Sequence, residues 1–183
     1  AYTRINVPKS YRAGIELQLK YALNKKYNTS YSITFSQNKI EEFTEYIDDY
    51  DQFTQVAIQH KNTNIALSPT LTTNRTFNWR PNDKLSFFWT TKYTSKQFLD
   101  NTQNKDRILD SYFINDINAH WTILNKTKFT MLLQLYANNL LDVQYAPNGY
   151  TYSYIYDRNL ITSNNFYPMA GRNYWISLKI DLK

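Results

Sequence analysis

The C-terminal stretch that decides the fold is Asn173-Tyr174-Trp175-Ile176-Ser177-Leu178-Lys179-Ile180-Asp181-Leu182. Large apolar residues occupy every second position, and polar residues fall between them together with Trp175. A strand points successive side chains to opposite faces, so this segment has one apolar face and one largely polar face. A strand of a soluble sandwich has the same pattern, so the interpretation depends on whether the alternation returns elsewhere.

The alternation does return, in six earlier segments that are mostly too long for ordinary sandwich strands. The predicted strands are Tyr11–Leu23, Tyr27–Gln37, Thr63–Trp79, Lys84–Lys96, Ser111–Leu124 and Thr127–Asn138. Pro69 falls inside the third of them, and because proline lacks a ladder donor we expect a bulge there. Short turns alternate with long polar segments, which are Asn38–Asn62, residues 97–110 and Asn139–Gly171.

This alternation of connections is typical of outer-membrane barrels, which have short periplasmic turns and long extracellular loops. A tilted strand of about twelve residues crosses roughly 30 Å, which is enough for a bilayer. The sequence therefore predicts an all-β fold, a transmembrane antiparallel β-barrel. Seven strands are too few to close one, because the smallest bacterial barrels have about eight. We expect residues 1–183 to be the C-terminal portion of a larger barrel, whose plug domain and N-terminal strands are absent.

Composition excludes several other classes of protein. No uninterrupted apolar run is long enough for a transmembrane helix. Cysteine is absent, so there is no disulfide framework or thiolate metal site. The net charge is +6, but the lysines and arginines are scattered, so we expect no nucleic acid as a partner. No motif of a nucleotide-binding loop, zinc hydrolase or serine hydrolase occurs, and we do not expect an enzyme.

Four stretches resemble a known family, and together they extend over nearly the whole chain. They are Asn6–Leu17, Lys92–Asn101, Asn138–Tyr145 and Phe166–Arg172. The third is similar to an Asn-Leu-Phe-Asp-x-x-Tyr motif that ends the next-to-last strand, and the fourth to a Tyr-x-x-Pro-Gly-Arg segment before the last strand. The chain thus resembles the C-terminal part of the barrel of TonB-dependent outer-membrane receptors, in the style common among Bacteroidota.

The resemblance implies a barrel of about 22 strands with a plugged lumen, in the outer membrane of a Gram-negative cell. It implies active uptake of a scarce nutrient, which is a ferric siderophore, cobalamin or an oligosaccharide. The implied partners are outer-membrane lipids, the rest of the barrel with its plug, the TonB energy-coupling complex and a surface lipoprotein. It also gives structural roles to the motif residues Asn139, Leu140, Asp142, Tyr145, Tyr167, Gly171 and Arg172.

The long polar segments contain the candidate ligand-binding residues. Aromatic side chains are suited to stack on a ligand, and the candidates that we select from the tyrosines of these segments are Tyr46, Tyr50, Tyr150, Tyr152, Tyr154 and Tyr156. Packing within the loops and an aromatic girdle are the alternative roles for them, and we assign Trp79 and Trp121 to the girdle. The acidic run Glu41–Asp51 has the oxygen ligands of a Ca²⁺ loop, or else is a solvated extracellular loop.

The two histidines, His60 and His120, are too far apart in sequence to indicate a metal pair, and we expect His120 to face the lumen. Charged residues on the polar faces are expected to pair with the plug; they are Arg12, Glu16, Lys20, Lys92, Lys179 and Asp181. Two other functions stay open at this point. One is a passive porin or structural barrel without a plug, and the other is a soluble all-β binding module.

Overall fold

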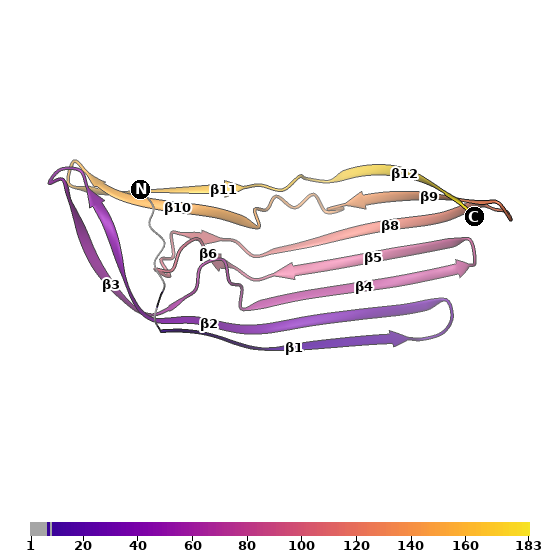
Figure 1. Ribbon diagram of the computed structural model, residues 1–183, viewed down its shortest axis with the longest axis horizontal. Helices are drawn as coiled ribbons and strands as arrows, with labels where there is room; N and C mark the ends of the chain where they lie inside the picture. The colour runs from indigo at the N-terminus through magenta and orange to yellow at the C-terminus, as the bar shows by residue number, and fades with distance from the viewer. Residues whose placement is uncertain (1–6, 8) are drawn as a thin grey trace.

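The computed structural model describes residue 7 and residues 9–183, a range that contains strands and no helix (Figure 1). The sequence predicts a loop over residues 1–10, and most of it lies outside the described residues, as does most of the Asn6-Val7-Pro8 portion of the first of the four family-like stretches. The strands are β1 (Ser10–Ala22), β2 (Tyr27–Asp49), β3 (Thr54–Asn64), β4 (Leu71–Asn82), β5 (Leu85–Thr94), β6 (Gln97–Phe98), β7 (Ile108–Leu109), β8 (Tyr112–Asn125), β9 (Phe129–Asn138), β10 (Asn148–Tyr156), β11 (Asn159–Tyr167) and β12 (Asn173–Leu182).

Seven of these strands form a curled wall, in the order β1, β2, β4, β5, β8, β9 and β12. Every neighbouring pair in the wall is antiparallel. The turn between β1 and β2 is tight because the side chain of Asn24 accepts hydrogen bonds from the backbone nitrogens of Lys26 and Tyr27. The predicted all-β, seven-stranded wall with short turns at one end is confirmed.

The long polar segment Asn38–Asn62, for which the sequence predicts no strand, is a hairpin. β2 continues to Asp49, and β3 returns beside it as the second strand of a long hairpin that rises beyond the wall (Figure 1). Ile40 and Ile47 are buried in this region. The hairpin was missed because most of its remaining side chains are polar on both faces, so it lacks the alternation that marks a half-buried strand.

The predicted strand Thr63–Trp79 is two strands. β3 ends at Asn64, and β4 begins at Leu71, after a loop in which Leu67 has a φ of 51°. Pro69 lies in that loop, and its carbonyl accepts a hydrogen bond from the hydroxyl of Ser36. The predicted bulge is therefore absent at Pro69, where the strand is broken instead. The pairing register between β4 and β5 does shift, but this irregularity lies near the short turn, between Trp79 and Asn82.

The segment Asn139–Gly171 also contains unpredicted strands, because β10 and β11 form a regular antiparallel hairpin within it. β10 then lies parallel to the end of β2, with Tyr154 opposite Asp48 and Ile155 opposite Asp49. Residues 97–110 contain only the two-residue strands β6 and β7. The three long polar segments are thus structured loops at the end of the wall opposite the short turns (Figure 1).

The apolar rows of the wall are exposed. Ile15 on β1 is 64% exposed and Ile176 on β12 is 71% exposed, and Trp121, on the inner strand β8, is 49% exposed. Near the short turns, the ring of Trp79 stacks on Tyr27 and on Phe87. Apolar surface of this extent and an aromatic belt at one end are what a lipid-facing wall requires.

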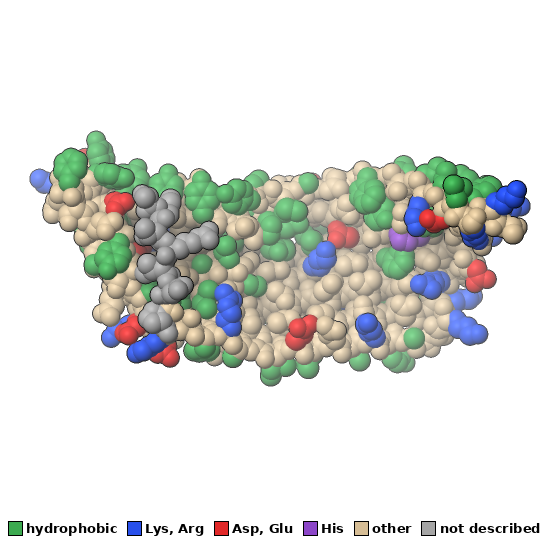
Figure 2. Space-filling model, viewed as in Figure 1, with side chains coloured by type: hydrophobic (Ala, Val, Ile, Leu, Met, Phe, Trp, Pro, Cys, Tyr) green, Lys and Arg blue, Asp and Glu red, His purple; other side chains and the backbone are tan. Residues whose placement is uncertain are grey.

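The opposite face of the wall is polar. Figure 2 shows a surface whose middle is mainly polar, with hydrophobic side chains along its two long margins. Hydroxyls on this face contact across strands, as in Thr76 and Thr90, which are 3.2 Å apart. Lys92 lies 3.8 Å from Asp116, and Lys179 lies 3.0 Å from Asp181. Some charges that the sequence assigns to the plug therefore already have partners within the wall.

One aromatic row crosses this polar face from β5 to β12. The ring centroids of Phe88 and His120 are 4.9 Å apart, and those of His120 and Tyr136 are 6.0 Å apart. Tyr136 then stacks on Trp175 at 3.7 Å with an interplanar angle of 3°. This stacking gives Trp175 a neighbour on the polar face, where its position in the alternation places it.

Candidate functional site

Arg107 joins the three long loops at a single point. It lies in the loop between β6 and β7, and its side chain is only 4% exposed. Its guanidinium donates to Glu45 on β2 at 3.0 Å, to Asp100 in its own loop at 2.7 Å and to the hydroxyl of Ser153 on β10 at 2.7 Å. One buried cation therefore links the β2–β3 hairpin, the β6–β7 loop and the β10–β11 hairpin.

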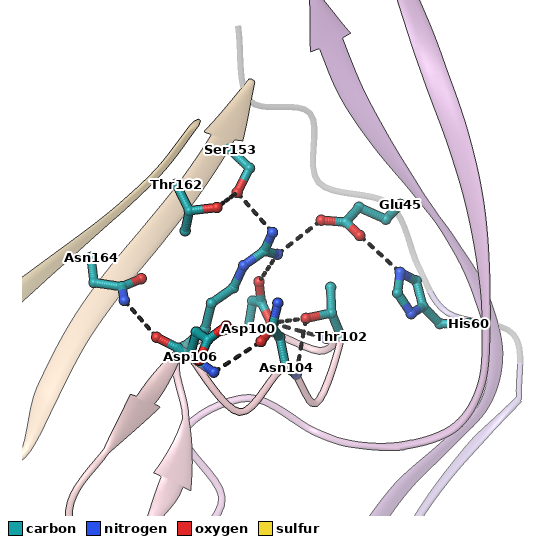
Figure 3. A network of polar contacts seen from close by, with 10 residues as sticks. Glu45, His60, Asp100, Thr102, Asn104, Asp106, Ser153, Thr162 and Asn164 are labelled. Carbon is teal, nitrogen blue, oxygen red and sulfur yellow. Dashed lines mark hydrogen bonds and ion pairs between the residues drawn. The ribbon is translucent and has the colours of Figure 1, made fainter. Parts of the chain in front are cut away.

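Two carboxylates surround the Arg107 guanidinium and stabilise its positive charge. Burial by itself lowers the pKa of the Arg107 guanidinium, but the hydrogen bonds and negative charges of Asp100 and Glu45 outweigh that effect and raise it overall. Glu45 has a second partner on the hairpin, because its other carboxylate oxygen lies 2.8 Å from Nε2 of His60. Figure 3 shows this network, with Glu45 and His60 from one hairpin facing Ser153 and Thr162 from the other.

Polar contacts inside the β6–β7 loop hold Arg107 in place. Asp100 accepts hydrogen bonds from the backbone nitrogen and the hydroxyl of Thr102, and Asn104 accepts one from the backbone nitrogen of Asp106. The side chain of Asn164 on β11 donates to the carbonyl of Asp106 at 2.7 Å (Figure 3). These turns are of the Asx type, which side chains of this kind favour in loops.

A pocket of about 740 Å³ lies beside this network, where β2 and β10 diverge from their short parallel contact. Four of the six predicted ligand-binding tyrosines line it, namely Tyr46, Tyr50, Tyr152 and Tyr154. Tyr50 packs edge-on against Tyr154, with ring centroids 5.7 Å apart, and Tyr152 stacks with Tyr154 at 6.3 Å. The structure therefore gathers tyrosines from two loops that are about a hundred residues apart in the chain.

The other two predicted tyrosines do not line this pocket. Tyr150 is tilted against Tyr167, with ring centroids 6.0 Å apart. Tyr156 ends β10 and is 59% exposed. Among the residues that do line the pocket, Asp100, Arg107 and Ser153 were not predicted, and Glu45 was considered only as a member of the acidic run. No sequence signal indicates them, because each is an ordinary polar residue whose partners come from distant segments.

The acidic run Glu41–Asp51 does not converge on one point. Glu45 faces Arg107 and His60, Asp48 accepts from Gln55, and Asp51 accepts from the backbone nitrogens of Asp157 and Arg158. In the described part of the chain, no three carboxylate or histidine side chains are grouped as metal ligands. Glu45 and Asp51 instead connect this hairpin to the other two loops, whereas Asp48 stays within the hairpin.

The family-motif residues form a second polar cluster, where β9 ends and β12 begins. The side chain of Asn139 is buried, accepts from the backbone nitrogen of Val143 at 3.0 Å and donates to its carbonyl at 2.9 Å. The backbone nitrogen of Asn139 donates to Asp116 on β8. Its φ of 48° is left-handed, a region that asparagine tolerates better than most residues.

The Asp142 side chain connects this turn to the last strand. Its Oδ1 accepts from the backbone nitrogen of Arg172 at 2.7 Å, and the Arg172 guanidinium reaches the carbonyl of Leu140 at 3.5 Å. A β-carbon at Gly171 would lie only 2.7 Å from the same Oδ1, so a larger residue would crowd this contact. Of the remaining motif residues, Tyr145 packs on Tyr112 with centroids 4.5 Å apart, whereas Tyr167 packs on Tyr150.

The two histidines are in separate environments. His60 belongs to the loop network, whereas His120 lies on the polar face of the wall, 3.3 Å from Gln134. The structure thus places His120 on the face that the sequence predicts. Among the described residues, no helix is long and apolar enough to span a membrane.

Comparison with known proteins identifies the architecture. Residues 1–140 match the family model described as "TonB dependent receptor-like, beta-barrel". No curated protein matches the chain. Several solved structures do, at identities that show the fold alone.

The siderophore receptor PiuA from Acinetobacter baumannii is one of these structures. It matches with a TM-score of 0.66 and 17% identity, over 93% of this chain and 21% of its own. The ferric citrate transporter FecA matches with a TM-score of 0.64 and 15% identity, over 93% of this chain and 24% of its own. The copper transporter OprC matches with a TM-score of 0.60 and 15% identity, over 95% of this chain and 24% of its own.

The chain spans about a fifth to a quarter of the length of these structures. The wall is therefore a part of a receptor barrel of the outer membrane, and the interpretation as a soluble all-β module is wrong. The matched proteins are receptors and transporters rather than enzymes. From its family match, its seven-stranded curled wall and its exposed apolar rows, the chain belongs to the TonB-dependent receptor-like β-barrel family.

Proposed function

We propose that this chain is the C-terminal wall and loop portion of an outer-membrane receptor that takes up a scarce nutrient actively. The loops capture the ligand, the plug shifts when the TonB complex pulls on it, and the wall is the conduit. The chain itself performs no covalent chemistry. The observation that carries this proposal is the match of residues 1–140 to the receptor barrel, which agrees with a polar inner face and an exposed apolar outer face.

The proposed partners are those of a complete receptor of this kind: outer-membrane lipids, the rest of the barrel and its plug, the TonB complex and a surface lipoprotein. The C-terminal motifs favour a receptor of the Bacteroidota style. The candidate ligand is a ferric siderophore, cobalamin or an oligosaccharide. Two of the matched structures support the first class by their names, since they are a siderophore receptor and a ferric citrate transporter.

The ligand-binding residues that we propose are the loop tyrosines, of which Tyr46, Tyr50, Tyr152 and Tyr154 have the stronger support because they line one pocket. A pocket of about 740 Å³ is within the size range of small-molecule sites. Tyr150 and Tyr156 lie near it on β10 and stay in the proposal as rim residues.

Uptake in cells tests the proposal. The receptor would be produced from its complete gene in a Gram-negative host with and without a compatible TonB, and growth would be followed with each candidate nutrient limiting. We expect growth to depend on both the receptor and TonB. Growth that needs the receptor but is unchanged when TonB is deleted would contradict active uptake.

The alternative is a passive porin or a structural barrel without a plug. Conductance of the purified complete protein in a planar lipid bilayer separates it from the receptor. A plugged barrel should show no steady open pore, because the plug fills the lumen. A large, constant conductance would support the passive porin instead.

A further inference from the structure

The charges that line the pocket between β2 and β10 are mainly negative. Glu45, Asp48 and Asp100 contribute carboxylates, whereas Arg107 is the single cation among the lining residues that the structure describes. Charges of one sign in a partly enclosed site focus the local potential and raise the concentration of ligands of opposite sign relative to ligands of the same sign. The pocket should therefore be unfavourable to anions.

Arg107 cancels one of these three negative charges, which leaves two in excess, but it is too buried to contact an incoming ligand directly. Its side chain is 4% exposed, and its two terminal nitrogens already donate to Glu45, Asp100 and Ser153. Its Nε is buried without a hydrogen-bond partner among the described residues, so almost no donor of this guanidinium is accessible to an anionic ligand. In contrast, Asp48 is exposed at the pocket.

The rings of the pocket belong to the same face as Asp48. Tyr154 is paired with Asp48 across the parallel contact of β10 and β2, and paired residues point to the same side of a sheet. Tyr152 and Tyr46 are two residues away on their strands and share that side. This face therefore combines aromatic rings, phenolic hydroxyls, a carboxylate and the neighbouring amide of Gln55, which donates to Asp48 at 2.7 Å.

We propose that this pocket takes an uncharged, polyhydroxylated ligand of the oligosaccharide class and disfavours anionic chelates. Hydroxyl groups of such a ligand donate to carboxylates, and the tyrosine rings provide flat apolar surface for its less polar faces. An anionic chelate would face the carboxylates without a free cation. The inference rests on the proposed role of these loops in capture, and it selects one class among the nutrients considered there.

The sign of the local potential can be measured without a ligand. The chain has no cysteine, so Tyr152→Cys introduces a reporter at the pocket, in the complete receptor with any other cysteine replaced by serine. The rate constants for its reaction with a cationic and with an anionic methanethiosulfonate reagent would be measured. Their ratio would then be divided by the corresponding ratio for a small-molecule thiol, which gives a normalised ratio. We expect the cationic reagent to be favoured about fivefold at an ionic strength of about 0.1 M.

The matched control adds Asp48→Asn to Tyr152→Cys, which removes one charge and keeps the shape of the side chain. In this double variant, the normalised ratio of cationic to anionic reaction rates should fall to about half of its value in Tyr152→Cys alone, or lower. A normalised ratio near one in the single variant Tyr152→Cys, or a ratio below one, would overturn the inference. Neither result depends on transport, so TonB-dependent growth would still test the proposed function separately.

Protection of the same cysteine tests the ligand class. Neutral hexasaccharides of glucose, mannose and xylose would be compared with ferric citrate as protectants against a neutral thiol reagent. We expect at least one hexasaccharide to slow the reaction about tenfold at saturation, and ferric citrate to have no effect. Protection by ferric citrate, or by none of the hexasaccharides, would overturn the assignment to oligosaccharides.

Discussion

Replacing Arg107 with alanine would leave the carboxylates of Glu45 and Asp100 without the cation between them. Removing one partner of a buried ion pair costs about 3–5 kcal/mol, because the remaining charge is desolvated and unpaired. We expect the three loops to separate locally while the wall stays folded. Hydrogen–deuterium exchange should become faster in β3, β10 and β11 and stay unchanged in β5 and β8.

Lys105→Ala is the matched control, because Lys105 is an exposed cation in the same loop. It should leave exchange in the three hairpin strands as it is in the wild type. Equal effects of Lys105→Ala and Arg107→Ala would mean that loop charge in general, rather than the buried contacts of Arg107, holds the loops together.

Asn139 allows a second test at the scale of a residue. Asn139→Ala removes the two side-chain hydrogen bonds to Val143 and places alanine at a φ of 48°. Asn139→Gly removes the same bonds but tolerates the backbone conformation. We expect both variants to lower the free energy of unfolding in urea, by about 1–3 kcal/mol for the lost bonds, with alanine about 1 kcal/mol worse than glycine. Equal values for the two variants would argue against backbone strain at this turn.

The two faces of β12 define a prediction at the scale of an element. Leu178 lies in the exposed apolar row, whereas Ser177 is opposite Gln134 on the polar face. A lysine on the lipid side of a barrel costs about 2–4 kcal/mol near the middle of the bilayer. We expect Leu178→Lys to reduce the heat-resistant folded fraction on a gel and Ser177→Lys to leave it nearly unchanged. The reverse ranking would mean that the faces are assigned the wrong way round.

The wall was predictable from sequence because each of its strands has one polar face and one apolar face. The loop strands β3, β10 and β11 carry polar side chains on both faces, so they lack this signal and the sequence predicts no strands there. Ile65 and Leu67 continued the alternation by chance, which hid the break before β4. The tyrosines were predicted for their chemistry, but Arg107 was missed because Glu45 is 62 residues away from it.

At the scale of the whole molecule, the curled wall has two open edges. β1 pairs only with β2, and β12 pairs only with β9, within the residues described. In lipid every backbone polar group needs a partner, so both edges should pair with further strands of the barrel. We expect the amides of β1 and β12 to exchange at least as slowly as those of β5 in the complete receptor, and much faster when residues 1–183 are produced alone. Equal protection in both proteins would contradict an open wall.

One side of this wall should touch lipid, while the other should face a polar interior. A spin label placed in turn at residues 174–182 of the complete receptor in lipid bilayers measures this directly, by its collisions with oxygen and with a water-soluble nickel complex. We predict that oxygen accessibility rises at Tyr174, Ile176, Leu178, Ile180 and Leu182 and falls at the positions between them. A profile without this two-residue period, or one with its maxima at the polar positions, would contradict the account.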